Sequence, residues 1–284
     1  MTSAQKLLKS VSLVLCTRNS AKLLENNLIH LQKIARDSEL IIIDGDSTDG
    51  TQEIAKKFTK RVFSDQKRGL SYARQLGIEK AHNPYVAFIG ADDILPKASL
   101  IKLLECLENN PQMAGVQPLT ILRTPQNYWE QTTKYIFKEL LNIIGPADII
   151  GTPCIFRRSS VKKVQYDEVI RGGCDDTDLC LRLCQAGYTL EKINVPSYEE
   201  QPLNFSGFVK RWQFYGKGDA QFYNKYQAQW STQRKVFSLL HPARKYFGQG
   251  TFRFLEIGRP ELIPALWIGA IARYIGWLQE AKGS

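Results

Sequence analysis

Hydrophobic and polar positions alternate with two different periods along the first two thirds of the chain. Short β-branched apolar runs predict strands, and apolar residues spaced three and four apart predict the helices between them. The predicted strands are residues 11–16, 40–44, 61–64, 85–89, 114–122, 149–156 and 189–193. Strands that alternate with helices are typical of an α/β fold with a largely parallel sheet covered on both faces.

The predicted helices divide the chain. Residues 20–36 and 96–107 carry leucines at helical spacing, and Asp49 is expected to cap a third helix, with Gln52 three positions on. Residues 126–145 insert a helical segment long enough to cover the mouth of a site. After about Pro202 the strand pattern stops, and residues 205–226, 233–247 and 261–281 predict helices. We therefore expect an α/β domain over residues 1–204 and a helical extension over residues 205–284.

Composition narrows the class of protein. With 284 residues and 43% hydrophobic side chains, the chain can bury a sizeable core, which excludes wholesale disorder. Its 38 Lys and Arg against 28 Asp and Glu give a formal charge of +10. This excess favours an anionic partner, such as a nucleic acid, a phosphorylated small molecule or an acidic lipid surface.

Six cysteines are spread along the chain without a paired framework, and the N-terminal residues lack the pattern of a secretory signal. A reducing, cytoplasmic compartment is therefore expected. Cys174, Cys180 and Cys184 have no nearby histidine or second cluster to complete a tetrahedral metal site, so we interpret them as buried or partly buried thiols.

Polar residues directly follow three of the predicted strands. They are Cys-Thr-Arg-Asn at 16–19, Asp-Gly-Asp-Ser-Thr-Asp-Gly-Thr at 44–51 and Gly-Ala-Asp-Asp at 90–93. Ligands of open α/β sheets bind beyond the carboxyl ends of the strands. Asp and Gly are ordinary turn residues, which explains any one of these segments. Carboxylates at several strand ends at once indicate a site where a cation or hydrogen-bond donors offset their repulsion.

Six segments between about residues 10 and 222 resemble glycosyltransferase family 2, the inverting nucleotide-sugar enzymes of GT-A fold. In order they read SLVLCTRN, LIIIDGDSTDGT, RGLSYARQLGI, YVAFIGADDILP, GTPCIFRRSSV and CDDTDLCLRLCQAGY. The resemblance implies a three-layer α/β/α sandwich with a mostly parallel sheet. It also implies a hexosyltransferase that moves a sugar from a UDP- or GDP-type donor to a hydroxyl acceptor. Such an enzyme would serve the synthesis of a polysaccharide, a cell-envelope glycan or a glycolipid.

The resemblance puts the nucleotide of the donor at the first two strand ends, where a carboxylate can accept a hydrogen bond from a ring N–H of uracil or guanine. The residues concerned are Thr17, Asn19, Asp44 and Asp46. Arg68 and Arg74 lie on the segment that approaches the nucleotide in this family, where a guanidinium can serve the ribose or the diphosphate. For Arg74 the alternative is a solvated helix face.

The segment from Gly90 to Asp93 aligns with the family's Asp-x-Asp motif, which binds a divalent metal on the diphosphate. Gly90 replaces the first aspartate, whereas Asp92 stands in the second position and Asp93 follows it. One carboxylate, diphosphate oxygens and water suffice for a hard cation. We therefore expect Mg²⁺ or Mn²⁺ at Asp92, with Asp93 beside the donor.

The segment from Cys174 resembles the family's Glu-Asp motif at the start of a helix, with Asp175 in the Glu position. An inverting transfer needs a general base that takes the proton of the attacking hydroxyl. We assign Asp176 as that base, Asp178 as the second candidate and Asp175 as a positioning or capping residue that contacts the donor. The alternative is that these carboxylates only stabilise a helix N-terminus.

Basic residues mark the C-terminal region. Arg211 and Lys217 lie in an aromatic segment that closes over the donor in related enzymes, which makes them candidates to neutralise the leaving diphosphate. Residues 262–278 are strongly apolar but short for a bilayer span, and they include Pro264 and Arg273. They are expected either to lie in a membrane interface or to pack on the domain.

Cations precede that apolar segment, which favours an anionic surface. The resulting hypothesis is a peripheral enzyme at the inner face of the cell membrane, acting on a lipid-linked or saccharide acceptor.

Two other functions fit parts of the pattern. A sugar nucleotidyltransferase shares the fold class but would normally carry a Gly-rich basic N-terminal loop, which residues 12–19 lack. A nucleic-acid-binding protein would explain the charge, but the sequence has no zinc finger, helix-turn-helix or RNP-type signature. Nucleic acid is therefore not expected as a partner.

Overall fold

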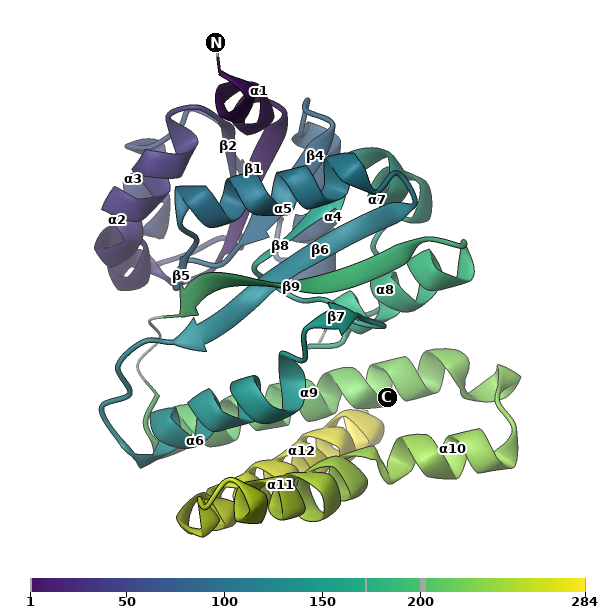
Figure 1. The fold of residues 1–284 in the computed structure, drawn as a ribbon. Coiled ribbons are helices and arrows are strands. Elements are labelled where there is room, and N and C mark those ends of the chain that lie inside the picture. Colours follow the sequence, from purple (N-terminus) through teal and green to yellow (C-terminus); the bar gives the residue numbers. More distant parts are fainter. Residues whose placement is uncertain (1, 172, 200–202, 284) are drawn as a thin grey trace. The chain divides into compact units, whose positions relative to one another are not determined.

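The computed structural model describes residues 2–171, 173–199 and 203–283, and the chain divides into two compact units (Figure 1). The first unit comprises Met1–Arg123, Ile144–Glu168 and Asp176–Gln201, and the second comprises Thr124–Ile143, Val169–Asp175 and Pro202–Ser284. This division differs from the two consecutive ranges expected from the sequence, because two internal segments belong with the C-terminal helices.

The first unit is built on one mixed sheet with the strand order β3-β2-β1-β4-β8-β6-β9-β5, and β7 pairs with β9. The strands are β1 (Val11–Thr17), β2 (Glu39–Asp44), β3 (Val62–Ser64), β4 (Tyr85–Ile89), β5 (Asp93–Ile94), β6 (Met113–Leu122), β7 (Gly145–Pro146), β8 (Cys154–Arg157) and β9 (Thr189–Glu199). Neighbours among β3, β2, β1 and β4 are parallel, whereas β8 is antiparallel to both β4 and β6.

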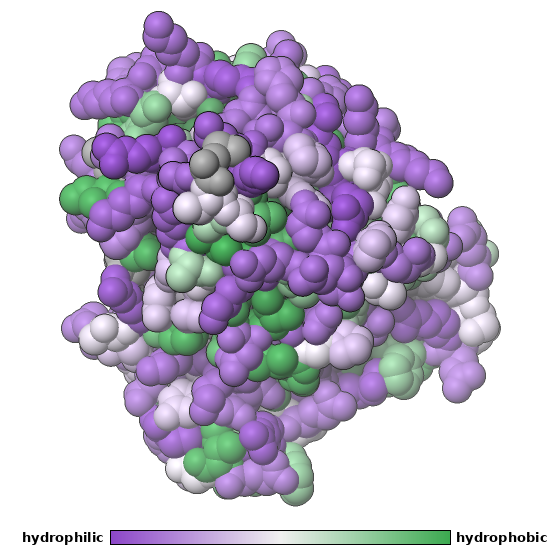
Figure 2. All heavy atoms as spheres, turned by 45° about the horizontal axis from the view of Figure 1, so that its top comes forward, coloured by the Kyte–Doolittle hydropathy of each residue, from purple (hydrophilic) through white to green (hydrophobic). Residues whose placement is uncertain are grey.

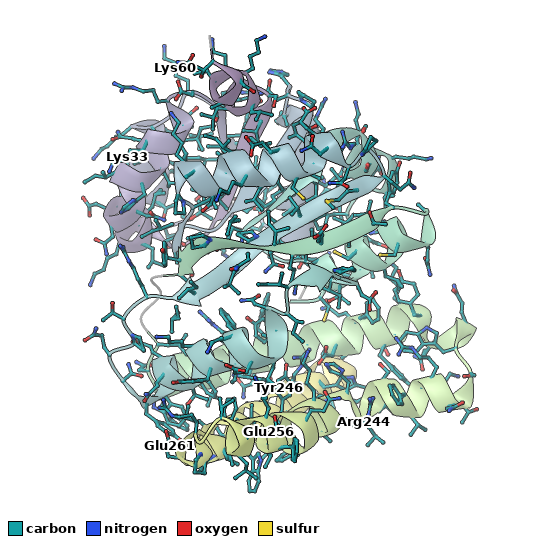
Figure 3. All side chains as sticks on the ribbon, in the orientation of Figure 1. Lys33, Lys60, Arg244, Tyr246, Glu256 and Glu261 are labelled. Atoms are coloured by element: carbon teal, nitrogen blue, oxygen red, sulfur yellow. The ribbon has the colours of Figure 1, made fainter. Side chains whose placement is uncertain are left out.

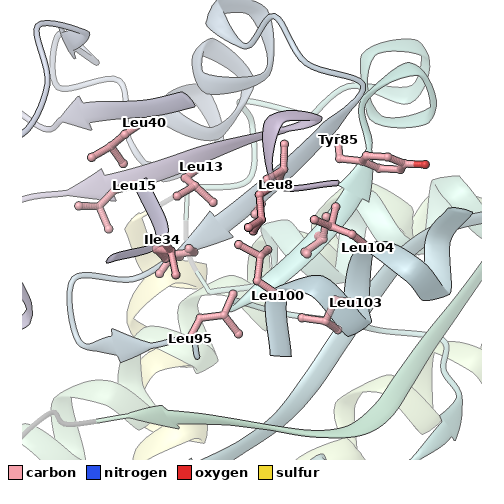
Figure 4. Packing of buried hydrophobic residues seen from close by; sticks show 14 of the residues in the cluster. Leu8, Leu13, Leu15, Ile34, Leu40, Tyr85, Leu95, Leu100, Leu103 and Leu104 are labelled. Atoms are coloured by element: carbon pink, nitrogen blue, oxygen red, sulfur yellow. The ribbon is translucent and has the colours of Figure 1, made fainter. Parts of the chain in front are cut away.

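Helices cover both faces of this sheet, because alternate strand residues point to opposite sides. Leu13 and Leu15 pack toward one face and Val14 toward the other. The first face carries α1 (Ser3–Lys9), α2 (Ala21–Ala35), α3 (Thr51–Lys56) and α5 (Lys97–Asn109), whose apolar residues fill the core drawn in Figure 4. The second carries α4 (Leu70–Lys80), α7 (Arg158–Val164) and α8 (Asp175–Gln185). The three-layer α/β/α fold expected from the sequence is confirmed.

Two local expectations are wrong. The strand predicted at residues 149–156 begins only at Cys154, since Gly151 and Pro153 interrupt it and a proline cannot donate to the ladder. Asp49 does not cap α3. Gly50, with φ of +88°, holds the N-cap position, and Asp49 accepts hydrogen bonds from the backbone N–H of Ala21 and of Thr51.

The second unit is helical. Its elements are α6 (Tyr128–Ile136), the π-helical turns η1 (Phe137–Leu141) and η3 (Ala243–Gly250), the 3-10 turns η2 (Gln227–Gln229) and η4 (Pro260–Leu262), and the helices α9 (Phe205–Tyr226), α10 (Thr232–Leu239), α11 (Thr251–Glu256) and α12 (Ile263–Gly283). Phe208, Trp212 and Tyr246 lie in its core, and Tyr246 is labelled in Figure 3. In the part of the chain that the structure describes, no helix is both long and apolar enough to span a bilayer.

Helices α9 and α12 are in backbone contact. A Cβ atom on Gly216 of α9 would lie 1.8 Å from the carbonyl oxygen of Arg273 on α12. The Arg273 guanidinium, in turn, bonds both carboxylate oxygens of Asp219, at 2.5 and 2.7 Å. This half-buried ion pair ties the two helices of the second unit together. The surface drawn in Figure 2 is mostly hydrophilic, with small separate apolar areas.

Candidate functional site

The carboxyl ends of the parallel strands bring the predicted nucleotide residues to one edge of the sheet. Thr17 is the register partner of Asp44, and Asp44 is the partner of Ser64. Leu15 pairs with Ile89, so Gly90 and the residues after it continue from the same edge. Strand β8 runs the opposite way, with Phe88 opposite Cys154, and its starting segment therefore lies at this edge as well.

Asp44 is buried and bonded within its own turn. Its carboxylate accepts hydrogen bonds from Ser47 N and Ser47 Oγ, at 2.8 and 2.6 Å, and from Gln52 Nε2 at 2.7 Å. A carboxylate has about four acceptor positions, so one remains for a ligand. Asp46 is more accessible, with φ of +53° and one hydrogen bond from Ser64 Oγ at 2.5 Å.

Thr17 and Asn19 flank this turn. Asn19 is exposed, and its Oδ1 accepts from the backbone N–H of Thr48 at 3.0 Å, which joins the first strand end to the second. Among the described residues, Thr17 Oγ1 is buried and has no hydrogen-bond partner. A buried hydroxyl without a partner costs free energy, so Thr17 is suited to a polar atom of a ligand.

Asp65 is a carboxylate at this edge that the sequence analysis did not include. It directly follows β3 and is buried, and this burial raises the pKa of its carboxyl group. Applying the strand-end rule to the third strand, as to the other three, would have found it.

The segment after β4 is folded around Gly90. Asp93 is buried, and its Oδ2 accepts a hydrogen bond of 2.7 Å from Gly90 N. A Cβ atom on Gly90 would lie 2.6 Å from Asp92 Oδ1 and 2.9 Å from Asp93 Oδ2. A side chain at position 90 would therefore displace one or both carboxylates. Asp92 is the half-buried one of the two.

The described residues contain no group of three or more His, Cys, Asp or Glu side chains arranged to hold a metal. Asp92, the half-buried carboxylate of the segment after β4, fits a hard cation whose remaining ligands are diphosphate oxygens and water, since Mg²⁺ commonly binds through one or two carboxylates and substrate phosphates.

Arg74 bonds the candidate base. Its Nη1 contacts Asp176 Oδ1, and its Nη2 donates to Thr152 Oγ1 at 2.8 Å. The Arg74 side chain is 8% exposed and that of Asp176 is 21% exposed. The alternative interpretation of Arg74 as a solvated helix residue is therefore wrong, and its partner is a carboxylate at the same sheet edge.

The neighbouring carboxylates are arranged differently. Asp178 is 1% exposed and bonds Arg182 one helical turn later, at 2.5 and 2.9 Å. Arg182 also donates to two backbone carbonyls at the end of α7, those of Val164 and Gln165. Asp175 is buried at the first position of α8. Of the three carboxylates, Asp176 is the most accessible to an acceptor.

Arg68 lies at the surface. Its guanidinium contacts Glu168 and lies 3.6 Å from the ring centre of Tyr72. The hydrogen bond from Arg68 to Glu168 raises the pKa of the guanidinium. Arg68 is exposed and lies near the sheet edge, one residue before the glycine that precedes α4.

The segment Val169–Asp175, which leads into α8, belongs to the second unit. Arg171 N donates to Gln221 Oε1 at 2.8 Å, and Cys174 Sγ donates to Asp219 Oδ1 at 3.3 Å. Gly218 permits a close approach, because a Cβ atom there would lie 2.7 Å from Cys174 N. Arg211 and Lys217 are half-buried on the same helix, α9, so their contact with a donor stays a prediction.

A family model described as Glycosyl transferase family 2 matches residues 12–165, more than half of the chain. Among curated proteins, the chain is 33% identical over 96 residues to cholesterol galactosyltransferase of Borreliella burgdorferi, covering 32% of this chain and 27% of that protein. It is 25% identical over 178 residues to poly-beta-1,6-N-acetyl-D-glucosamine synthase of Staphylococcus epidermidis, covering 58% and 43%. The chain thus matches less than half the length of these relatives.

Solved structures share the fold. Mannosyltransferase PcManGT of Pyrobaculum calidifontis, in complex with GDP-Man and Mn²⁺, has a TM-score of 0.59 and 17% identity, and the match covers 99% of this chain and 84% of that one. Residues 1–349 of TarS of S. aureus, in complex with UDP-GlcNAc, have a TM-score of 0.54 and 14% identity, with 97% and 92% covered. At such identities the likeness is one of fold.

Proposed function

Because the chain belongs to glycosyl transferase family 2, we propose that it is an inverting glycosyltransferase. It takes a sugar from a nucleoside-diphosphate donor of UDP or GDP type and passes it to a hydroxyl group of an acceptor. The observation that carries the proposal is the meeting of several strand ends at one edge, where Thr17, Asp44 and the segment containing Asp92 converge.

The nucleotide is proposed to bind over the first three strand ends. The remaining acceptor position of Asp44, the accessible Asp46 and the unpartnered hydroxyl of Thr17 suit the ring N–H groups and hydroxyls of a nucleoside. Asn19 joins the two turns around it. The fold relatives carry GDP-Man and UDP-GlcNAc, which supports the donor class and leaves both bases as candidates.

The diphosphate is proposed to bind next to Asp92. A divalent cation held there would neutralise charge on the leaving nucleoside diphosphate, and the Mn²⁺ complex of the mannosyltransferase supports this choice. Asp93 keeps the loop in position through its bond to Gly90 N. Arg68, Arg211 and Lys217 are the proposed cationic contacts of the diphosphate from the protein.

Asp176 is proposed as the general base. In an inverting transfer the acceptor hydroxyl attacks the anomeric carbon in line with the leaving diphosphate, and its proton passes to a carboxylate. Asp176 is partly exposed and is oriented by Arg74, whereas Asp178 is occupied by Arg182. We therefore assign Asp176 this role, with Asp175 as the buried residue that starts the helix.

The acceptor is proposed to be a saccharide or a lipid-linked saccharide. The names of the relatives include a cholesterol galactosyltransferase and a poly-beta-1,6-N-acetyl-D-glucosamine synthase, which supports glycan or cell-envelope synthesis. An acceptor of this kind is carried by, or made at, a membrane, so the proposal includes a peripheral location at its inner face.

A donor screen tests the function. The full chain is incubated with UDP- and GDP-sugars and Mn²⁺, and release of nucleoside diphosphate is measured with and without acceptor. Asp176→Asn should lower turnover by about 10²- to 10⁴-fold, because a general base is lost, and should leave donor binding close to that of the wild type. Unchanged turnover in this variant would eliminate Asp176 as the base, and indifference to every nucleotide would eliminate the function.

A further inference from the structure

The outer face of α12 is apolar. From Pro264 to Leu278, every exposed residue of this helix is apolar, including Trp267, Ile271 and Ile275. Their exposed fractions, with that of Leu278, lie between 42% and 52%. They recur three and four residues apart and so form one stripe along the helix. A helix that packs one side on a domain normally presents polar residues on the other, and α12 does not.

The inner side of α12 is already occupied. Gly276 is so close to α9 that a Cβ atom there would lie 2.0 Å from the carbonyl oxygen of Gln213, and Gly269 packs on the ring of Trp212. Leu262 and Leu266 are fully buried. The sequence left two alternatives for this segment, packing on the domain or contact with a membrane. One side of α12 packs on α9. The apolar stripe on its other side is therefore the surface that is open to a partner.

The apolar stripe continues onto the neighbouring helix α11. Trp267 Nε1 donates to Thr251 Oγ1 at 2.8 Å, which sets the start of α11 beside it. Phe252 and Leu255, in the same two turns, are 65% and 55% exposed. We call Phe252, Leu255, Trp267, Ile271, Ile275 and Leu278 the apolar face.

Helix α10 and the residues that follow it lie beside α12 and carry cations. The Tyr274 hydroxyl donates to the carbonyl of Leu239 at 3.0 Å, which joins α12 to the end of α10. Arg234 of α10 and Arg244 of η3, which is labelled in Figure 3, are exposed. Arg244 covers the ring of Phe237, which is 48% exposed.

The region that carries the apolar face has a net positive charge. Residues 231–284 contain eight Lys or Arg and three Glu. Two of these glutamates are already bonded to arginines, Glu256 to Arg253 and Glu261 to Arg259. An apolar surface bordered by excess cations is complementary to a bilayer with anionic headgroups. Two copies of the chain facing each other would instead bring like charges together.

We propose that the apolar face inserts into the headgroup region of a membrane containing anionic lipids, with α12 lying parallel to the surface. This deepens the proposed function and rests on it for the presence of an acceptor at the membrane. Trp267 and the ring of Phe252 then lie at the depth that aromatic side chains favour, and Arg234 and Arg244 contact lipid phosphates.

Co-sedimentation of the full chain with vesicles tests the proposal. Phosphatidylcholine vesicles, with and without phosphatidylglycerol, are compared at low and high salt. The wild type should pellet with the anionic vesicles at low salt and be released as salt screens the charges. The double variant Ile271→Asp, Ile275→Asp should stay in the supernatant. Ile29→Asp, which changes an isoleucine of α2 that is 61% exposed, should pellet like the wild type.

A second pair of variants separates charge from apolar contact. Arg234→Gln with Arg244→Gln should weaken vesicle binding by roughly fivefold for each charge removed at low salt. Lys33→Gln with Lys60→Gln removes the same charge from exposed lysines of the first unit and should change binding little (Figure 3). Equal binding by both pairs would overturn the role of the cations.

Three results would overturn the membrane surface itself. They are no pelleting of the wild type, equal pelleting of the aspartate double variant, and a wild-type dimer that this variant converts to monomers without any vesicle binding. Donor hydrolysis, measured in parallel, keeps the two proposals apart. Loss of vesicle binding with intact hydrolysis refutes only the surface, whereas vesicle binding by a wild type that turns over no donor refutes only the function.

Discussion

Arg74 and Asp176 form an ion pair although they lie far apart in the sequence. One guanidinium nitrogen bonds the carboxylate and the other bonds Thr152 Oγ1, and the guanidinium carbon lies 5.8 and 5.7 Å from the ring centres of Phe88 and Tyr166. The arginine belongs to α4 and the aspartate to the start of α8. This planar guanidinium, bonded on two sides, fixes the orientation of the Asp176 carboxylate.

Replacing Arg74 should therefore affect turnover more than donor binding. Arg74→Gln is expected to lower kcat by about 10²-fold with a small change in KM for the donor, since the base is misplaced and not removed. Arg74→Lys should retain part of the activity. Arg68→Gln serves as the comparison and should instead raise KM. Steady-state kinetics of the wild type and these three variants provide the test. An Arg74→Gln variant in which only KM for the donor changes would indicate instead that Arg74 contacts the nucleotide.

Asp178 should matter for stability and not for turnover. Asp178→Asn leaves Arg182 without its buried partner, which is expected to cost about 3 kcal/mol of unfolding free energy. The double variant Asp178→Asn, Arg182→Gln should recover part of that loss. Urea unfolding and kcat of the folded fraction are the measurements. A severe loss of kcat in a fully folded Asp178→Asn protein would make it the base.

An aspartate at position 90, where the family's Asp-x-Asp motif has one, should not create a stronger metal site. Gly90→Asp puts a side chain within 2.6 Å of Asp92 Oδ1 and 2.9 Å of Asp93 Oδ2, which adds a third negative charge and breaks the bonding of the turn. We expect a lower melting temperature and no gain in Mn²⁺ affinity, measured by thermal shift with UDP and GDP. Asp92→Asn should weaken the Mn²⁺-dependent part of nucleotide binding. Tighter Mn²⁺ binding by Gly90→Asp would contradict the geometry.

His241 should make the protein sensitive to mild acid. Burial lowers the pKa of its imidazole to about 4, with repulsion from Arg273, Lys245 and Arg244 acting in the same direction and Asp219 acting against it. The unfolded chain, with an ordinary histidine pKa near 6.5, then binds more protons between these two pH values. Stability should fall as the pH drops from about 6.5 to 4. Melting temperatures across this range should decline less for His241→Gln than for the wild type, and parallel curves would refute the assignment.

A methyl group added at the close contact between α9 and α12 should lower the stability of the protein. Gly216→Ala forces a Cβ atom against a backbone carbonyl that cannot move alone, and we expect a loss of about 1–3 kcal/mol or more. Gly248→Ala is the matched control, because the nearest atom to its Cβ would be 4.0 Å away. Denaturant unfolding of both variants provides the measurement, and equal stabilities would argue against the close packing.

The periodicity of the chain predicted the strands that carry the nucleotide residues because each is a short, fully buried run with a polar end. Thr17 and Asp44 were therefore predicted at one edge, and the register confirms that they are neighbours. Asp65 follows the same rule, but the rule was not applied to the strand predicted at residues 61–64, which Asp65 directly follows.

The Arg74–Asp176 contact could not be predicted from local patterns. The two residues are 102 positions apart, and only the packing of α4 and α8 on the same face of the sheet joins them. The division of the chain into two units could not be predicted from local patterns for a similar reason. Residues 124–143 pack with helices that come much later in the chain, and hydrophobic periodicity carries no information on which distant helix a segment will meet.

The peptide bond between Asp175 and Asp176 is one of the points at which the chain passes between the two units. On one side of it, Cys174 and Arg171 are tied to α9, and on the other stands the carboxylate proposed to remove the acceptor's proton. The residue proposed for the chemical step is thus the direct covalent neighbour of a segment whose contacts belong to the helical unit.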